Sequence, residues 1–176
     1  TPDSFYKKSR STNSNFAIKK SNQMISDGAS IIDIGGESSR PGAKKISIEE
    51  EMQRVIPSII DFKKNNLVTQ ISLDTRNLPT MKLGLESGVD IINDISGFAD
   101  HNKIKFVSKF NLPVIVMHMQ NEPNNMQIEP KYSFAPIDIY KILSKRVNLL
   151  IQMGVNKSNI VVDPGIGFGK NIYHNL

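Results

Sequence analysis

The 176-residue chain contains no cysteine. A disulfide-stabilised scaffold, a thiolate zinc site, an iron–sulfur cluster and a cysteine nucleophile are therefore excluded. Long hydrophobic runs are also missing. Even the longest apolar runs are short ones such as Val114–Met117, so no segment is long enough to span a bilayer. No apolar stretch follows a basic N-terminus, which leaves no visible signal peptide. We therefore expect a soluble, cytoplasmic protein without a membrane partner.

Tryptophan is absent too, and the scattered Phe and Tyr residues are not interleaved with basic residues. The 22 basic and 17 acidic residues give a net charge of +5, much of it in surface-like Lys pairs. A nucleic-acid interface would need basic residues clustered on one face with aromatics between them, so we expect no nucleic-acid partner. A mildly positive field suits small anionic substrates. The length and the 39% hydrophobic content predict a single domain, 1–176.

Apolar, β-branched runs alternate along the chain with amphipathic helical patterns. The runs lack polar alternation, as expected for strands covered on both faces. Strands are predicted at 29–34, 68–73, 89–92, 113–117 and 160–162, and helices at 15–26, 48–60, 78–86, 103–110 and 138–153. Ser47 and Glu50 form a capping-box pattern, Asn77 is a candidate cap, and Pro57 should kink or split its helix.

Each predicted strand runs into small and polar residues, such as Asp74, Asn93 and Asp163. Five strands that deliver polar groups to one edge are typical of a (β/α)8 barrel, whereas a doubly wound sheet gathers its ligand groups at one switch point. The run from Gly165 to Lys170 fits neither a phosphate loop nor a dinucleotide turn. A lone His such as His118 is interpreted as a hydrogen-bonded core residue.

Taken together, the motifs resemble those of the dihydropteroate synthase family, in its order and spacing and over the whole chain. The family is a (β/α)8 barrel of folate biosynthesis, so the resemblance implies an incomplete barrel that runs from the end of strand 1 through strand 6. The motifs are Thr1-Pro2-Asp3-Ser4-Phe5, Asp33-Ile34-Gly35-Gly36-Glu37-Ser38-Ser39-Arg40-Pro41-Gly42, Ile91-Ile92-Asn93-Asp94-Ile95-Ser96-Gly97, Met117-His118-Met119 and Asp163-Pro164-Gly165-Ile166-Gly167-Phe168-Gly169-Lys170.

The resemblance implies a transferase that joins 6-hydroxymethyl-7,8-dihydropterin diphosphate to 4-aminobenzoate and releases diphosphate. It also implies Mg²⁺ as the cofactor, sulfonamides as competitors of aminobenzoate, and a homodimer for the full-length protein. The donor-rich edge of a pterin matches carboxylate and amide side chains.

By this resemblance, the pterin pocket comprises Asp74, Asn93, Met117, Asp163 and Phe168. Asp74 and Asp163 would also stabilise the positive charge that develops on the pterin methylene.

The resemblance assigns further roles to residues in loops. Ser39 would bind the diphosphate, in a position where the family usually has Thr. Arg40 and Pro41 belong to a loop that closes over aminobenzoate, and Phe5 belongs to a second loop with Asp3, which completes the catalytic set.

The chain departs from the family in three respects. Lys7 replaces an acidic loop residue. The family's metal-binding Asn would lie before Thr1, so no metal ligand is expected within the chain. A later Lys and an Arg-x-His of the family have no counterpart, and a barrel needs about 250 residues. We therefore expect a fragment of a larger enzyme that is inactive by itself.

Three alternatives remain open at this point. A pterin-dependent methyltransferase domain would use the same barrel. A non-catalytic pterin-binding module would bind pterin without turnover. A bare fragment would show neither binding nor a cooperative melt.

Overall fold

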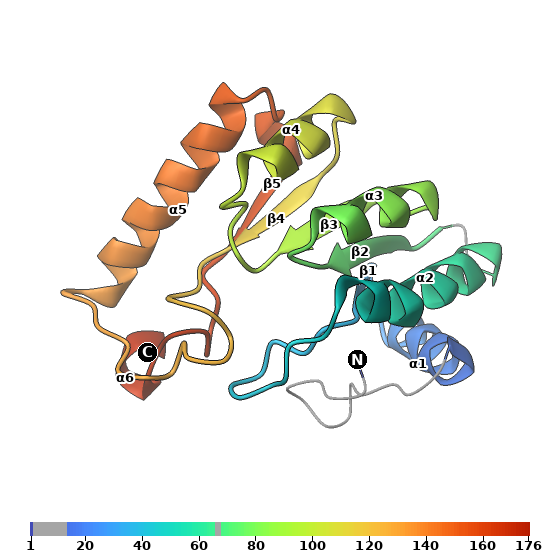
Figure 1. Ribbon diagram of the computed structural model, residues 1–176, viewed down its shortest axis with the longest axis horizontal. Helices are drawn as coiled ribbons and strands as arrows, with labels where there is room; N and C mark the ends of the chain where they lie inside the picture. Colours follow the sequence, from blue (N-terminus) through green and yellow to red (C-terminus); the bar gives the residue numbers. More distant parts are fainter. Residues whose placement is uncertain (2–13, 66–67) are drawn as a thin grey trace. The chain divides into compact units, whose positions relative to one another are not determined.

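In the computed structural model, which describes residues 1, 14–65 and 68–176, strands and helices alternate along the chain (Figure 1). The strands form one five-stranded sheet in the order β1-β2-β3-β4-β5. β1 pairs with β2 in parallel, and so does β4 with β5. The strands are β1 (Ile31–Gly35), β2 (Gln70–Asp74), β3 (Ile91–Asp94), β4 (Val114–Met117) and β5 (Ile160–Asp163).

All five predicted strands and all five predicted helices are present, with ends that differ from the sequence-based ones by a few residues. The sequence did not predict the short helix α6 or the 3-10 turn η2, because both are too short for a periodic pattern. The helices are α1 (Ser14–Ser26), α2 (Ile48–Asn65), α3 (Leu78–Glu86), α4 (His101–Lys109), α5 (Ala135–Gln152), η2 (Lys157–Asn159) and α6 (Ile172–Asn175).

The structure bears on two local expectations about the helices. α2 is not split at Pro57 but continues through it. The carbonyl that loses its partner there belongs to Gln53, and because Gln53 and Pro57 are both exposed, water can bond to that carbonyl. Asn77 is at the N-cap position of α3, yet its side chain makes no capping bond. Its amide instead donates to the Glu51 carboxylate at 3.0 Å.

The chain divides into two compact units, one of residues 1–40 and 44–92, the other of residues 41–43 and 93–176. In the first unit α2 packs on β1, α1 and α3 (Figure 1). In the second, α5 packs on β4. The assignment of 1–176 as a single domain stays a prediction.

Close packing between β2 and α3 fixes the core of the first unit. Leu73 of β2 and Met81 of α3 are both fully buried. Gly84 lies opposite Leu73, where an added Cβ would be 2.4 Å from the Leu73 side chain. A glycine is therefore required inside this helix by the approach of the strand rather than by backbone conformation.

The core of the second unit lies between β4 and α5. Val114 and Val116 of β4 and Leu150 of α5 have no exposed surface. β5 is different, because Val161 and Val162 are 57% and 51% exposed. Among the described residues, no helix is long and apolar enough to cross a membrane.

The Gly84–Leu73 packing gives a first test. Replacing Gly by Ala inside a helix normally stabilises it, by about 1 kcal/mol. Here we expect Gly84→Ala to destabilise the protein by about 1–3 kcal/mol, because overpacking outweighs propensity. Urea-induced unfolding measures the change. Leu73→Val should relieve the clash, so the double variant should lose less stability than the two single losses added together. A stabilised Gly84→Ala variant would contradict this account of the core.

Candidate active site

Among the described residues, those predicted to bind ligand lie near the carboxyl ends of the strands or in the loops that follow. Asp74 is the last residue of β2, half-buried beside its register partner Gly35 of β1. A Cβ on Gly35 would lie 3.4 Å from the Asp74 carboxylate, at ordinary van der Waals distance, so the two residues lie directly side by side. Ser39 and Arg40 are half-buried in the loop after β1, where the Arg40 N–H donates to Ser38 Oγ at 3.4 Å.

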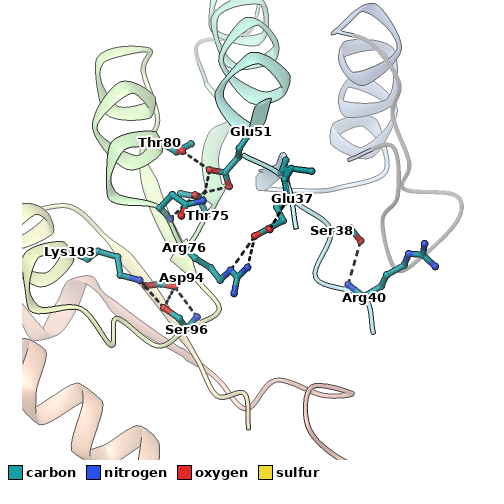
Figure 2. A network of polar contacts seen from close by, with 12 residues as sticks. Glu37, Ser38, Arg40, Glu51, Thr75, Arg76, Thr80, Asp94, Ser96 and Lys103 are labelled. Carbon is teal, nitrogen blue, oxygen red and sulfur yellow. Dashed lines mark hydrogen bonds and ion pairs between the residues drawn. The ribbon is translucent and has the colours of Figure 1, made fainter. Parts of the chain in front are cut away.

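A buried carboxylate organises the loop after β2 (Figure 2). Glu51 of α2 is 1% exposed. It accepts hydrogen bonds from the Thr75 hydroxyl at 2.8 Å and the Thr80 hydroxyl at 2.5 Å, besides the amide of Asn77. A buried charge without partners is costly, and these neutral donors offset that cost. The loop that begins directly after Asp74 is thereby anchored to α2.

An ion pair connects the same loop to the loop after β1. Arg76 donates from Nη2 and Nε to one oxygen of Glu37, at 2.7 and 3.2 Å (Figure 2). Arg54 of α2 adds a bond from Nη1 to the Gly36 carbonyl at 3.0 Å. Both loops of the first unit are therefore held by charged hydrogen bonds between partly buried groups.

In the second unit, Met117 of β4 and Asp163 of β5 are register partners at the ends of their strands. Asp163 Oδ1 accepts a hydrogen bond from the Gly165 N–H at 2.7 Å. Within the described part of the chain, its other carboxylate oxygen accepts none. Phe168 is half-buried in the loop after β5, and Asn93 is half-buried within β3. The structure therefore brings Met117 and Asp163 together.

The loop after β3 contains a second buried carboxylate. Asp94 has no exposed surface and pairs with Lys103 of α4, Nζ to Oδ2, at 2.5 Å (Figure 2). Its oxygens also accept from the Ser96 N–H and hydroxyl and from the Phe98 N–H. Phe98 is buried with φ +54°, a left-handed conformation that is strained for a bulky residue. The Asp94 network holds this turn directly after Asn93.

A buried cation organises the loop after β5. Lys170 is 3% exposed, and its Nζ lies 2.9 Å from Nδ1 of His118, which is also 3% exposed. Burial, with a smaller contribution from Lys170, lowers the pKa of His118 to about 4, so its ring is neutral near pH 7. Burial likewise lowers the pKa of Lys170 to about 8, although Asp163 acts in the opposite direction. The interpretation of His118 as a hydrogen-bonded core residue is confirmed.

Three charged residues in or beside these loops were not predicted from the sequence to be buried: Glu51, Lys103 and Lys170. Each is a charged side chain in an ordinary helical or loop context, and nothing in its spacing marks it as buried. Asp3 and Phe5 lie outside the described residues. Pro41 is exposed.

A metal ion would find no cluster of side-chain ligands among the described residues. Among residues 1, 14–65 and 68–176, no group of three or more His, Asp or Glu side chains is arranged to hold one. What these residues offer is carboxylate, amide and apolar surface at strand ends. Such a set can pair with the N–H groups of a flat heterocycle and stabilise a nearby positive charge.

The buried neutral His118 predicts a pH dependence of stability. Its pKa is about 6.5 unfolded and about 4 folded, so the unfolded state binds more protons between these values. The free energy of unfolding should therefore fall as the pH falls from 6.5 to 4. Urea-induced unfolding over this range, compared with His118→Asn, isolates the contribution. Equal pH slopes in the two proteins would show that His118 does not titrate as stated.

Comparisons with known proteins identify relatives over the full chain. A sequence profile described as pterin binding enzyme matches residues 1–176. A dihydropteroate synthase of Haemophilus influenzae is 38% identical over 175 residues, 99% of this chain but 63% of that protein. The chain thus spans somewhat less than two thirds of that relative's length.

Solved structures of dihydropteroate synthases also match this chain over part of their length. The Yersinia pestis dihydropteroate synthase in a sulfonamide drug complex matches with a TM-score of 0.92 and 36% identity, over 99% of this chain and 63% of that one. The Xanthomonas albilineans dihydropteroate synthase in complex with 7,8-dihydropteroate matches with a TM-score of 0.82 and 27% identity, over 99% and 61%. The prediction of an incomplete (β/α)8 barrel is confirmed, because the parallel strands and alternating helices match about three fifths of these barrels. The chain therefore belongs to the family of pterin binding enzymes.

Proposed function

We propose that the complete protein carrying this chain is a dihydropteroate synthase. It would condense 6-hydroxymethyl-7,8-dihydropterin diphosphate with 4-aminobenzoate to give 7,8-dihydropteroate and diphosphate. The observation that carries the proposal is Asp163: a carboxylate at the end of β5 with one oxygen fixed by the Gly165 N–H and the other accepting no hydrogen bond from the described residues. Such an oxygen suits the N–H edge of a pterin.

The proposed pterin pocket consists of Asp74, Asn93, Met117, Asp163 and Phe168. Met117 is 5% exposed and offers polarisable surface to a ring, while the half-buried Phe168 offers an aromatic face. Ser39 is proposed to bind the diphosphate, and Arg40 and Pro41 to close over aminobenzoate.

The reaction breaks the bond between the pterin methylene carbon and the diphosphate oxygen, and the diphosphate leaves with the electron pair. The lone pair of the 4-aminobenzoate amine then forms the new C–N bond, and the amine loses a proton to solvent. Positive charge develops on the pterin methylene between these events. The carboxylates of Asp74 and Asp163 would stabilise it electrostatically, with Asp3 assigned a supporting catalytic role.

Some proposals concern the complete protein only. Magnesium remains the proposed cofactor, with an Asn before Thr1 as its expected ligand, and no step above is assigned to it. Competition by sulfonamides, a homodimer and a cytoplasmic location also stay predictions.

Asp163→Ala tests the pocket. Removing an acceptor that pairs with buried N–H groups should weaken pterin binding by about ten-fold or more. Isothermal titration of the complete protein with 7,8-dihydropteroate measures the Kd. Asp61→Ala is a matched control, because Asp61 makes no side-chain hydrogen bond among the described residues of α2. Wild-type affinity in Asp163→Ala would overturn the assignment of the pocket. Pterin binding by the wild type without diphosphate release would instead favour a non-catalytic module.

Ser39→Ala tests the diphosphate contact. Losing one hydroxyl should raise the KM for the pterin diphosphate by about three- to ten-fold. The Kd for 7,8-dihydropteroate should stay unchanged, because that compound carries no diphosphate and so serves as the internal control. An unaltered KM would show that this hydroxyl is not used.

A further inference from the structure

Lys170 stands out as a buried charge with no assigned role. Its Nζ donates to the carbonyl oxygens of Gly165 and Phe168, each at 2.9 Å, and to that of His118 at 3.4 Å. Its fourth contact is Nδ1 of His118 at 2.9 Å. All four partners are neutral groups. The ammonium therefore does not point outward toward an anion, as a lysine of a phosphate loop would; it binds the backbone of its own loop.

The loop that surrounds this ammonium is unusually tight. Gly165 and Gly169 have φ angles of +68° and +60°, which favour glycine. A Cβ at Gly165 would lie 2.0 Å from the His118 carbonyl oxygen, and one at Gly169 would lie 2.8 Å from Gln120. The loop after β5 is thus pressed against the loop after β4. Tyr132 donates to the Gly169 carbonyl at 2.7 Å and adds a further connection.

Burial of this ammonium carries a cost that the protein would avoid if packing were its only role. A buried charge is seldom a net gain in stability, and an apolar side chain of similar size is often as good. However, an apolar replacement would leave the carbonyls of Gly165, Phe168 and His118 without the shared donor. The contacts of Lys170 therefore specify one conformation of the loop rather than maximise stability.

Gly165 connects that conformation to the proposed pterin pocket. Its N–H binds Oδ1 of Asp163, while its carbonyl accepts from Lys170 and from the Phe168 N–H at 3.0 Å. Two successive peptide groups that meet at the Cα of Gly165 therefore hold the Asp163 carboxylate and Phe168. Lys170 fixes the second of these peptide groups, and the conformation of Gly165, at φ +68°, connects it to the first, which binds Asp163.

We propose that Lys170 is a positioning residue, which holds the 163–170 loop so that Asp163 and Phe168 are presented to the pterin ring. This inference rests on the proposed function. Lys170 itself touches no substrate in this arrangement. His118 contributes to the same positioning, because its unprotonated Nδ1 accepts a hydrogen bond from the Lys170 ammonium.

Lys170→Met in the complete protein is the main test, because Met retains the length but donates no hydrogen bond. We expect the Kd for 7,8-dihydropteroate to rise about ten-fold or more, with shifted amide resonances for Gly165 and Gly167. Lys131→Met is the matched control: Lys131 lies in the neighbouring loop with a side chain that is 83% exposed. Wild-type affinity in a folded Lys170→Met protein would overturn the proposal.

His118 supplies a second pair of variants in case Lys170→Met does not fold. His118→Asn keeps an acceptor for the ammonium and should retain pterin affinity to within about three-fold. His118→Leu removes the acceptor and should lose affinity as Lys170→Met does. A merely structural role would affect melting temperature in both without separating their affinities. Equal affinities for 7,8-dihydropteroate in the two variants would contradict the positioning role.

The two proposals fail in different ways. If the wild-type protein bound no 7,8-dihydropteroate, the proposed function would fail first. If the wild type bound it and Lys170→Met bound it equally well, only the positioning role would fail.

Discussion

The cost of burying a charge governs how this chain arranges its functional loops. Glu51, Asp94 and Lys170 are each 5% exposed or less, and each is surrounded by hydrogen-bond partners from the loop that follows a strand. Because a buried charge tolerates only geometries that satisfy it, each network selects one loop conformation. The strands place the loops, and the buried charges determine their shape.

The three networks satisfy their buried charges with different chemistry, and Figure 2 shows those of Asp94 and Glu51. Asp94 is neutralised by Lys103, in an ion pair with further hydrogen bonds. Glu51 is satisfied by the hydroxyls of Thr75 and Thr80 and by one amide. Lys170 is satisfied by carbonyls and a neutral imidazole. In each case the network lies beside a residue of the proposed pterin pocket: Asn93, Asp74 or Asp163.

The sequence could predict those features of the fold and the site that leave a local pattern in the chain. Buried strands and amphipathic helices have periodic signals, and the polar residues at strand ends follow from where strands stop, so both could be predicted. The partners of buried charges could not, because Glu51 and Lys103 occupy helix positions whose neighbours come from other elements. Asn77 illustrates the limit: its cap position was predictable, but its preference for Glu51 over the helix N-terminus depends on tertiary contact.

Rigid loops also fit the chemistry proposed for the site. A pterin presents a fixed row of donors, so its binding gains most when the acceptors are already in place and lose little freedom. The N–H of Gly165 anchors one oxygen of Asp163 in this way. An anchored carboxylate cannot rotate to pair with water as a free one does, so its remaining oxygen keeps its direction when charge develops on the substrate. Gly165 and the buried charges therefore have the same role, which is to hold the acceptor groups of the proposed pocket in fixed positions.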